Sequence, residues 1–191
     1  MLVPTDVEAQ LLFADDPPLS PMAVCGFGLA DAGVGAAHAI ASAPAEAATG
    51  VVLIGAAGSY DERRAPVGSA LVAGSVELHG ISARGRSPTA LGFSRSDVAE
   101  LDLRGYADGG TLLSVTQSSG DWAEATRRSS STGAIAEEME AYAVAVAARL
   151  RGVPLTVVRG ISNLAGEPNF HHWRMPEALA AARALLREIE R

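Results

Sequence analysis

The chain has 191 residues, 48% of them hydrophobic, and a net charge of −7, which suits a single domain with a substantial core. This acidic balance and the lack of arginine-rich runs interleaved with aromatic residues argue against nucleic acid as a partner. No apolar run approaches the roughly 20 residues of a membrane helix. The single Cys25 cannot form a disulfide within the chain, and no signal peptide is evident. We therefore expect one domain over residues 1–191, located in the cytoplasm, with no membrane partner.

Strand-like and helical patterns alternate along the sequence. In chain order, the first half predicts a strand over 1–4, a helix capped by Thr5 or Asp6, a strand over 22–27, a helix over 30–43, and strands over 50–58 and 69–78. The second half predicts a strand over 110–120, a helix over 139–151, a strand over 155–163 and an amphipathic helix over 175–190. This alternation predicts an α/β protein, a three-layer α/β/α sandwich, with ligands at the carboxyl ends of its strands.

Three carboxylates surround Met139 at the head of an apolar segment. Residues 141–148 are apolar on nearly every face, so the helix that they predict belongs inside the protein. Carboxylates at a helix start are favoured by the helix dipole, which suffices for Glu137 and is an acceptable interpretation for Glu138. Glu140 enters the buried helix itself, where a carboxylate needs a partner. That partner is either a protein group or a ligand.

Other short motifs were considered as sites for a cofactor, a metal or a nucleophile. Gly26 and Gly28 fit the first two positions of a dinucleotide-binding loop, but Asp31 occupies the third, so we expect no nicotinamide cofactor. His171 and His172 are adjacent, which is not a helical metal spacing, and we expect no metal. No G-x-S-x-G sequence is present, which argues against a hydrolase nucleophile of that type. The sequence thus predicts neither a cofactor nor a metal.

Taken together, several motifs resemble one family. Glu-Met-Glu at 138–140, followed by Arg-x-x-Ser-Asn at 159–163, resembles the signature of the purine nucleoside phosphorylase and nucleosidase superfamily. The Asn form, followed by "HHWRMPEAL", is similar to futalosine hydrolases, which release hypoxanthine from futalosine in menaquinone biosynthesis. The segments "VPTDVEAQLL", "CGFGLADAGVGAA" and "VVLIGAAGS" match the superfamily in the same order. The resemblance implies a nucleoside phosphorylase-like fold with a mixed central sheet.

The resemblance also implies roles for individual residues. Glu8 corresponds to the carboxylate that orients and deprotonates the attacking water, and Met139 and Glu140 correspond to the ribose contacts. Asn163 stands beside the base, where a carboxamide suits a 6-oxopurine. The implied catalytic residues are Glu8, Asn163 and Glu140. The implied substrate-binding residues are Glu138, Met139, Ala57, Gly58, Thr116, Ser119 and Ser162.

Three functional hypotheses stay open on the sequence. The first is a futalosine-type nucleosidase, although "EPNF" at 167–170 replaces the basic run usual in that family and leaves the group on the ribose open. The second is a methylthioadenosine-type nucleosidase or a phosphorylase of the same fold, whose candidate phosphate ligands are Arg63, Arg64, Arg84 and Arg86. The third is a non-catalytic nucleoside-binding protein. The family usually completes its pocket from a neighbouring subunit, so we expect a homodimer or higher homo-oligomer that takes a small purine nucleoside.

Overall fold

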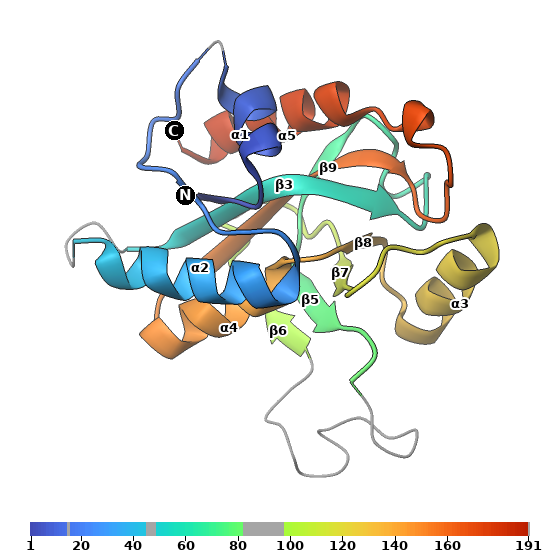
Figure 1. Cartoon of the computed structure of the whole chain (residues 1–191), viewed down its shortest axis with the longest axis horizontal. Coiled ribbons are helices and arrows are strands. Elements are labelled where there is room, and N and C mark those ends of the chain that lie inside the picture. Colours follow the sequence, from blue (N-terminus) through green and yellow to red (C-terminus); the bar gives the residue numbers. More distant parts are fainter. Residues whose placement is uncertain (15, 45–48, 82–97, 191) are drawn as a thin grey trace.

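The computed structural model describes residues 1–14, 16–44, 49–81 and 98–190 (Figure 1). Its strands are β1 (Leu2–Val3), β2 (Ala23–Val24), β3 (Val51–Ser59), β4 (Ala70–Val72), β5 (Ser75–Leu78), β6 (Val98–Glu100), β7 (Thr111–Ser114), β8 (Ala136–Glu138) and β9 (Leu155–Leu164). Its helices are α1 (Asp6–Phe13), α2 (Gly28–Ser42), α3 (Trp122–Thr132), α4 (Ala141–Arg151), the short 3-10 helix η1 (Phe170–His172) and α5 (Met175–Ile189). Within the described ranges, no helix is both long and apolar enough to cross a membrane.

The nine described strands form one mixed sheet, in which the order β2-β1-β3-β8-β7-β5-β6 makes the main path. The two longest strands, β3 and β9, run parallel side by side at its centre, and β4 pairs with the far edge of β9 in the antiparallel direction. The end of β3 passes antiparallel to β8, where Gly58 pairs with Glu137. This pairing places β8 at the carboxyl ends of the central parallel strands.

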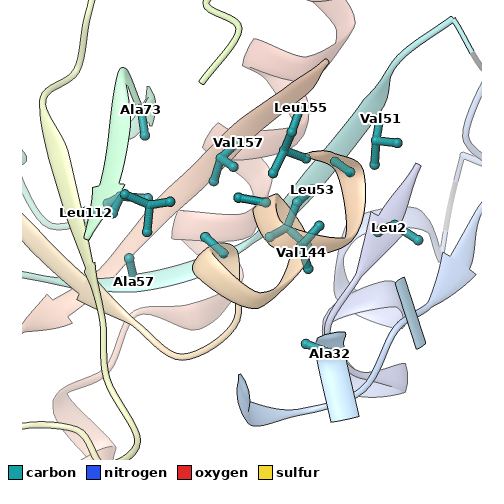
Figure 2. Packing of buried hydrophobic residues seen from close by; sticks show 14 of the residues in the cluster. Leu2, Ala32, Val51, Leu53, Ala57, Ala73, Leu112, Val144, Leu155 and Val157 are labelled. Atoms are coloured by element: carbon teal, nitrogen blue, oxygen red, sulfur yellow. The ribbon is translucent and has the colours of Figure 1, made fainter. Parts of the chain in front are cut away.

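Two helical layers cover the sheet. Figure 1 shows α1 and α5 over one face and α2 and α4 over the other. Between the sheet and the α2–α4 layer lies the larger apolar cluster, which Figure 2 shows around Leu53, Val144 and Val157. A second cluster, with Ile54 and Leu179 at its centre, lies under α1 and α5. The expected three-layer α/β/α sandwich with a mixed sheet is confirmed.

Local sequence signals set the ends of the helices that border the site. Thr5 is the N-cap of α1, and its hydroxyl oxygen accepts the backbone N–H of Glu8. Helix α4 ends at Gly152, which adopts the left-handed conformation that favours glycine. Helix α5 begins just before a proline, which tolerates the first helical turn because it lacks an N–H. These signals confirm the sequence-based helix boundaries within a few residues.

Four predicted elements differ from the structure. The strand predicted over 22–27 is only the two-residue strand β2. The run 69–78 is two strands, β4 and β5, because the chain turns at Gly74, where a Cβ would lie only 2.2 Å from the carboxylate of Asp108. The strand predicted over 110–120 ends at Ser114. Residues 136–138 form strand β8 rather than a helix start, so α4 begins two residues later than predicted. Strand β6 and helix α3 were not predicted from the sequence.

Candidate active site

A cavity of about 230 Å³ lies at the carboxyl ends of the central strands. Its walls come from the start of α1, the ends of β3 and β9, residues 115–118, the β8–α4 junction and the residues around the start of α5. A larger hollow of about 370 Å³ lies at the amino end of β9, between α4 and residues 98–102. Because α/β proteins bind ligands at the carboxyl ends of their strands, we take the smaller cavity as the candidate site.

Glu8 sits at the cavity with both carboxylate oxygens oriented by the protein. Its Oε1 accepts the backbone N–H of Ala56 at 3.0 Å, and its Oε2 accepts the hydroxyl of Thr5 at 2.8 Å. Thr5 and Glu8 stand three residues apart at the start of α1, the spacing of a helix capping box. The same hydroxyl that caps the helix therefore fixes the carboxylate, and each oxygen keeps a lone pair for a ligand.

Arg159 is fully buried beneath the cavity and links its carboxylates. Its Nη2 donates to Glu138 and, at 3.3 Å, to Oε2 of Glu140. Its Nε and Nη1 have no partner in the described structure. A Cβ on Gly55 would lie 2.3 Å from this Nη1 and 2.8 Å from Oε1 of Glu8, so glycine is required for the two side chains to approach. Arg159 itself is not among the residues that line the cavity, so it supports the site from below.

Glu140 is the N-cap residue of α4 and is 4% exposed. Its Oε1 accepts the N–H of Gly28 at 3.0 Å, at the amino end of α2. The pKa of Glu140 is raised to about 7, mainly because of burial. Arg159 and the Gly28 N–H oppose this rise, whereas the nearby carboxylates of Glu138 and Glu8 add to it. The positive charge around this carboxylate does not balance the negative charge, so a ligand that carries or develops positive charge would be favoured.

Glu138 already has a full set of donors. Its Oε2 accepts the backbone N–H groups of Glu140 at 2.9 Å and Ala141 at 2.7 Å, besides the guanidinium of Arg159. Its Oε1 accepts the hydroxyl of Ser114. The helix-start interpretation therefore holds for Glu138, which caps the first turn of α4 from strand β8. Its contact with a substrate stays a prediction.

Asn163 reaches the cavity through a β-bulge in β9. Ala57 pairs with Ile161 but Gly58 pairs with Asn163, so Ser162 is an extra residue and both it and Asn163 line the cavity. The Asn163 Nδ2 donates to the carbonyl of Leu164 at 2.9 Å, and its Oδ1 accepts the Ser162 hydroxyl at 2.7 Å. Because the carbonyl can only accept, the orientation of this carboxamide is fixed. One N–H of Nδ2 remains for a ligand.

Glu137 belongs to a second buried cluster. Its carboxylate accepts the hydroxyl of Tyr60, the N–H and hydroxyl of Ser119, and Nη1 of Arg128. Burial and the hydrogen bond to Glu137 raise the pKa of Tyr60, which therefore stays a proton donor. The helix-start interpretation of Glu137 is wrong, because the residue lies in strand β8 and none of these donors belongs to a helix start.

Most of the predicted site residues come together at this cavity. Those in its lining are Glu8, Ala57, Gly58, Glu138, Met139, Glu140, Ser162 and Asn163. Thr116 and Ser119 are not in the lining: Thr116 is exposed and Ser119 is bound to Glu137. The strand ends at Ser114, so period-2 alternation no longer describes these residues, and Val115 and Ser118 face the cavity instead.

Several apolar lining residues were missed by the sequence reasoning. They are Val7, Phe27, Val115, Trp173 and Met175. Phe27, Trp173 and Met175 lie within the motifs that carry the family resemblance, which was the only available signal. Val7 and Phe27 are 65% and 61% exposed, so the mouth of the cavity is apolar and open to solvent.

The candidate phosphate ligands do not support a phosphate site in the described structure. Arg63 and Arg64 are exposed and absent from the cavity lining. Arg84 and Arg86 lie outside the described residues. Among the residues that the structure describes, no group of three or more histidine, cysteine, aspartate or glutamate side chains is arranged to hold a metal ion.

The chain belongs to the phosphorylase superfamily, whose family model matches residues 21–191. Among individual proteins, it is 37% identical over 179 residues to the futalosine hydrolase of Streptomyces coelicolor, an alignment that covers 82% of this chain and 75% of that protein.

Two solved structures from Helicobacter pylori share the fold at 19% identity. A variant of 5′-methylthioadenosine/S-adenosylhomocysteine nucleosidase with 5′-methylthioadenosine in its active site has a TM-score of 0.80, and the match covers 99% of this chain and 96% of that chain. The futalosine hydrolase of the same organism has a TM-score of 0.76, with 99% and 95% covered.

Proposed function

We propose that the protein is a futalosine hydrolase-type nucleosidase, an N-glycosidase that cleaves a purine nucleoside with water. The observation that carries this proposal is the convergence of Glu8, Glu140 and Asn163 on one cavity from three separate elements. The identity to a futalosine hydrolase over most of the chain supports the same class of reaction. Overall, water adds to C1′ of the ribose, the C1′–N9 bond breaks, and the base leaves with a proton.

Glu8 is the proposed general base. Its two oxygens are fixed by Ala56 and Thr5, so its remaining lone pairs have defined directions. A carboxylate fixed in this way can orient a water molecule and accept its proton as the bond to C1′ forms. The buried guanidinium of Arg159 places positive charge near this carboxylate.

Glu140 is the proposed sugar-binding carboxylate. Ribose hydroxyls would supply the hydrogen-bond donors that its buried oxygens still lack, and such charge-assisted bonds are about twice as strong as neutral ones. Cleavage of a glycosidic bond develops positive charge on the sugar ring. Three carboxylates, Glu8, Glu138 and Glu140, surround the single guanidinium of Arg159, and this excess of negative charge would stabilise the developing cation.

Asn163 is the proposed base-recognition residue. Its free Nδ2–H can donate to a purine carbonyl or ring nitrogen, while Leu164 and Ser162 hold the amide in place. A donor at this point suits a 6-oxopurine such as hypoxanthine, because an amino group would meet it donor to donor. We therefore propose hypoxanthine as the released base and futalosine as the substrate, which implies a role in menaquinone biosynthesis.

Water is favoured over phosphate as the nucleophile. In the described part of the chain, no arginine belongs to the cavity lining, and the nearest guanidinium, Arg159, is already engaged by Glu138 and Glu140. A phosphate beside Glu8 would also place like charges at close range. A phosphorylase is therefore the second candidate.

We further propose a cytoplasmic homo-oligomer, most simply a dimer. The exposed apolar side chains Val7 and Phe27 at the cavity mouth support this, because burying them against a second subunit would close the site. Light scattering at micromolar concentration tests it, and a monomer would count against it.

One experiment tests the function directly. The purified protein is incubated with futalosine, aminofutalosine, methylthioadenosine and inosine, with and without phosphate, and the products are identified. We expect hypoxanthine from futalosine without phosphate. A strict need for phosphate with a sugar phosphate as product would make the protein a phosphorylase, and the absence of any cleavage would make it a binding protein.

A further inference from the structure

Glu137 lines the candidate site, but both of its carboxylate oxygens are already bound by protein donors. It is 4% exposed, and its Oε1 accepts the Ser119 N–H at 2.6 Å. Its Oε2 accepts the Tyr60 hydroxyl at 2.5 Å, the Ser119 hydroxyl at 2.7 Å and Nη1 of Arg128 at 3.0 Å. Three donors therefore bind Oε2 and one binds Oε1, so the protein itself holds both oxygens of this carboxylate.

The donors that bind Glu137 also attach one wall of the cavity to it. Val115 and Ser118, which line the cavity, lie in the segment between β7 and α3. Nη1 of Arg128 also donates to the carbonyl of Gln117 at 2.9 Å, so the residues on both sides of Ser118 are attached to the same buried ion pair. Glu124 holds the other guanidinium nitrogen, Nη2, at 2.6 Å and so fixes Arg128 itself.

We propose that Glu137 is a positioning residue which, together with Arg128, holds the 115–119 wall in the shape that binds the substrate. The inference rests on the nucleosidase function proposed above. The groups proposed to carry the chemistry lie on other segments, so loss of the clamp should weaken binding more than turnover. A wall displaced by about 1 Å can reduce efficiency by up to roughly a hundredfold.

The test uses two variants of the full-length protein. Glu137→Gln removes the charge with little change in shape. The double variant Arg128→Met/Glu137→Met removes the whole pair, which avoids leaving one buried charge without a partner. For both we expect KM for futalosine and inosine to rise about tenfold or more with kcat changed much less. Hydrogen exchange of the Ser119 amide should accelerate in the double variant, because methionine offers no oxygen to accept that N–H.

Thr156→Val is the matched control for lost stability. Thr156 is fully buried, and its hydroxyl accepts Nε of Arg104 at 3.0 Å, in a part of β9 that is not in the cavity lining. This variant should lower the melting temperature and leave KM unchanged. If the Glu137 variants lose stability but keep the wild-type KM, the residue is only structural and the inference is wrong. If the wild-type protein cleaves none of the nucleosides, the proposed function is wrong, and the inference that rests on it is wrong as well.

Ser119→Ala separates positioning from direct contact. If Ser119 acts through the clamp, the effects of Ser119→Ala and Glu137→Gln on KM should be clearly non-additive in the double variant, because the hydroxyl lost in one donates to the carboxylate changed in the other. Additive effects would instead support direct contact between Ser119 and the substrate, as the sequence predicted, and would contradict the clamp.

Discussion

Two buried carboxylate clusters meet at strand β8, and they differ in how well their charges are matched. Glu137 accepts from four protein donors and is paired with Arg128. On the other side, Glu138 and Glu140 share Arg159 with Glu8, so that three carboxylates surround one guanidinium. The first cluster pairs Glu137 with Arg128, whereas the second has an excess of negative charge around Arg159. Both arginines keep buried donors without a partner in the described structure, Nε in Arg128 and both Nε and Nη1 in Arg159.

This difference in charge balance distinguishes the cluster that supports the site from the cluster that we propose takes part in the reaction. A satisfied buried network fixes geometry, because each donor and acceptor would lose a partner if the network moved. An unbalanced network holds its groups in unfavourable states, which is reflected in the pKa of Glu140, raised to about 7 mainly by burial. Such a site gains more from a ligand that brings hydrogen-bond donors and developing positive charge.

The largest expected effect is on turnover in Glu140→Gln. The variant should fold and lose at least about two orders of magnitude in kcat, about 2.7 kcal/mol of barrier, because the neutral amide cannot stabilise the cationic sugar. Steady-state kinetics of purified variants provides the measurement, with Glu137→Gln as the comparison that affects mainly KM. Near-normal kcat in a folded Glu140→Gln protein would remove the proposed contrast between the clusters.

The raised pKa of Glu140 also predicts how stability depends on pH. Below its ordinary value of 4.5 this carboxyl is protonated in both states. Between about pH 4.5 and 7 the unfolded chain releases the proton that the folded protein keeps, so the free energy of unfolding falls as pH rises and levels off above about 7. The contribution should be about 3 kcal/mol.

Urea unfolding of the wild type and Glu140→Gln at about pH 5 and about pH 8 measures this contribution. The variant should gain stability relative to the wild type at the higher pH, even though it is inactive. Equal pH dependence in the two proteins would show that Glu140 titrates normally. That result would contradict the proposed excess of negative charge around Arg159.

Gly55→Ala tests the close approach of Glu8 and Arg159. The added Cβ would lie 2.3 Å from Nη1 of Arg159 and 2.8 Å from Oε1 of Glu8, so one side chain must move. Overpacking of this kind costs about 1–3 kcal/mol of stability, and here we expect kcat to fall as well.

Gly109→Ala is the control, since its Cβ would meet the carbonyl of Val72 at 2.6 Å, away from the lining residues. Both variants should melt at a lower temperature, but only Gly55→Ala should lose turnover at a temperature where both are folded. A shared loss of kcat would mean that general destabilisation accounts for the effect.

The smallest expected effect is a change of base preference in Asn163→Asp. A carboxylate loses the donor that faces a purine carbonyl and can accept from an amino group, so the ratio of kcat/KM for futalosine over aminofutalosine should fall about tenfold to a hundredfold. An unchanged ratio would show that Asn163 does not distinguish the bases, although the catalytic carboxylates could still act as proposed.

Sequence patterns were most successful where one residue type satisfies a local backbone requirement. A cap at Thr5 or Asp6, the Gly152 helix end and the central strands β3 and β9 were all predicted, and Thr5 is the cap. The patterns failed around β8, where Glu137 and Glu138 were assigned to a helix start although both lie in a strand. Carboxylates have low strand propensity, and only the hydrogen bonds from neighbouring segments make this strand favourable.

The sequence by itself determined the alternation of strands and helices, the apolar faces of the core and the identity of the polar residues available for chemistry. These follow from local propensity and periodicity, which depend on neighbours in the chain. Only the tertiary structure decided that Glu137 and Glu138 enter different networks, that the bulge in β9 turns both Ser162 and Asn163 to the cavity, and that Arg159 lies beneath Glu8. Those outcomes depend on strand alternation, register and contacts between residues far apart in sequence, and no local pattern encodes them.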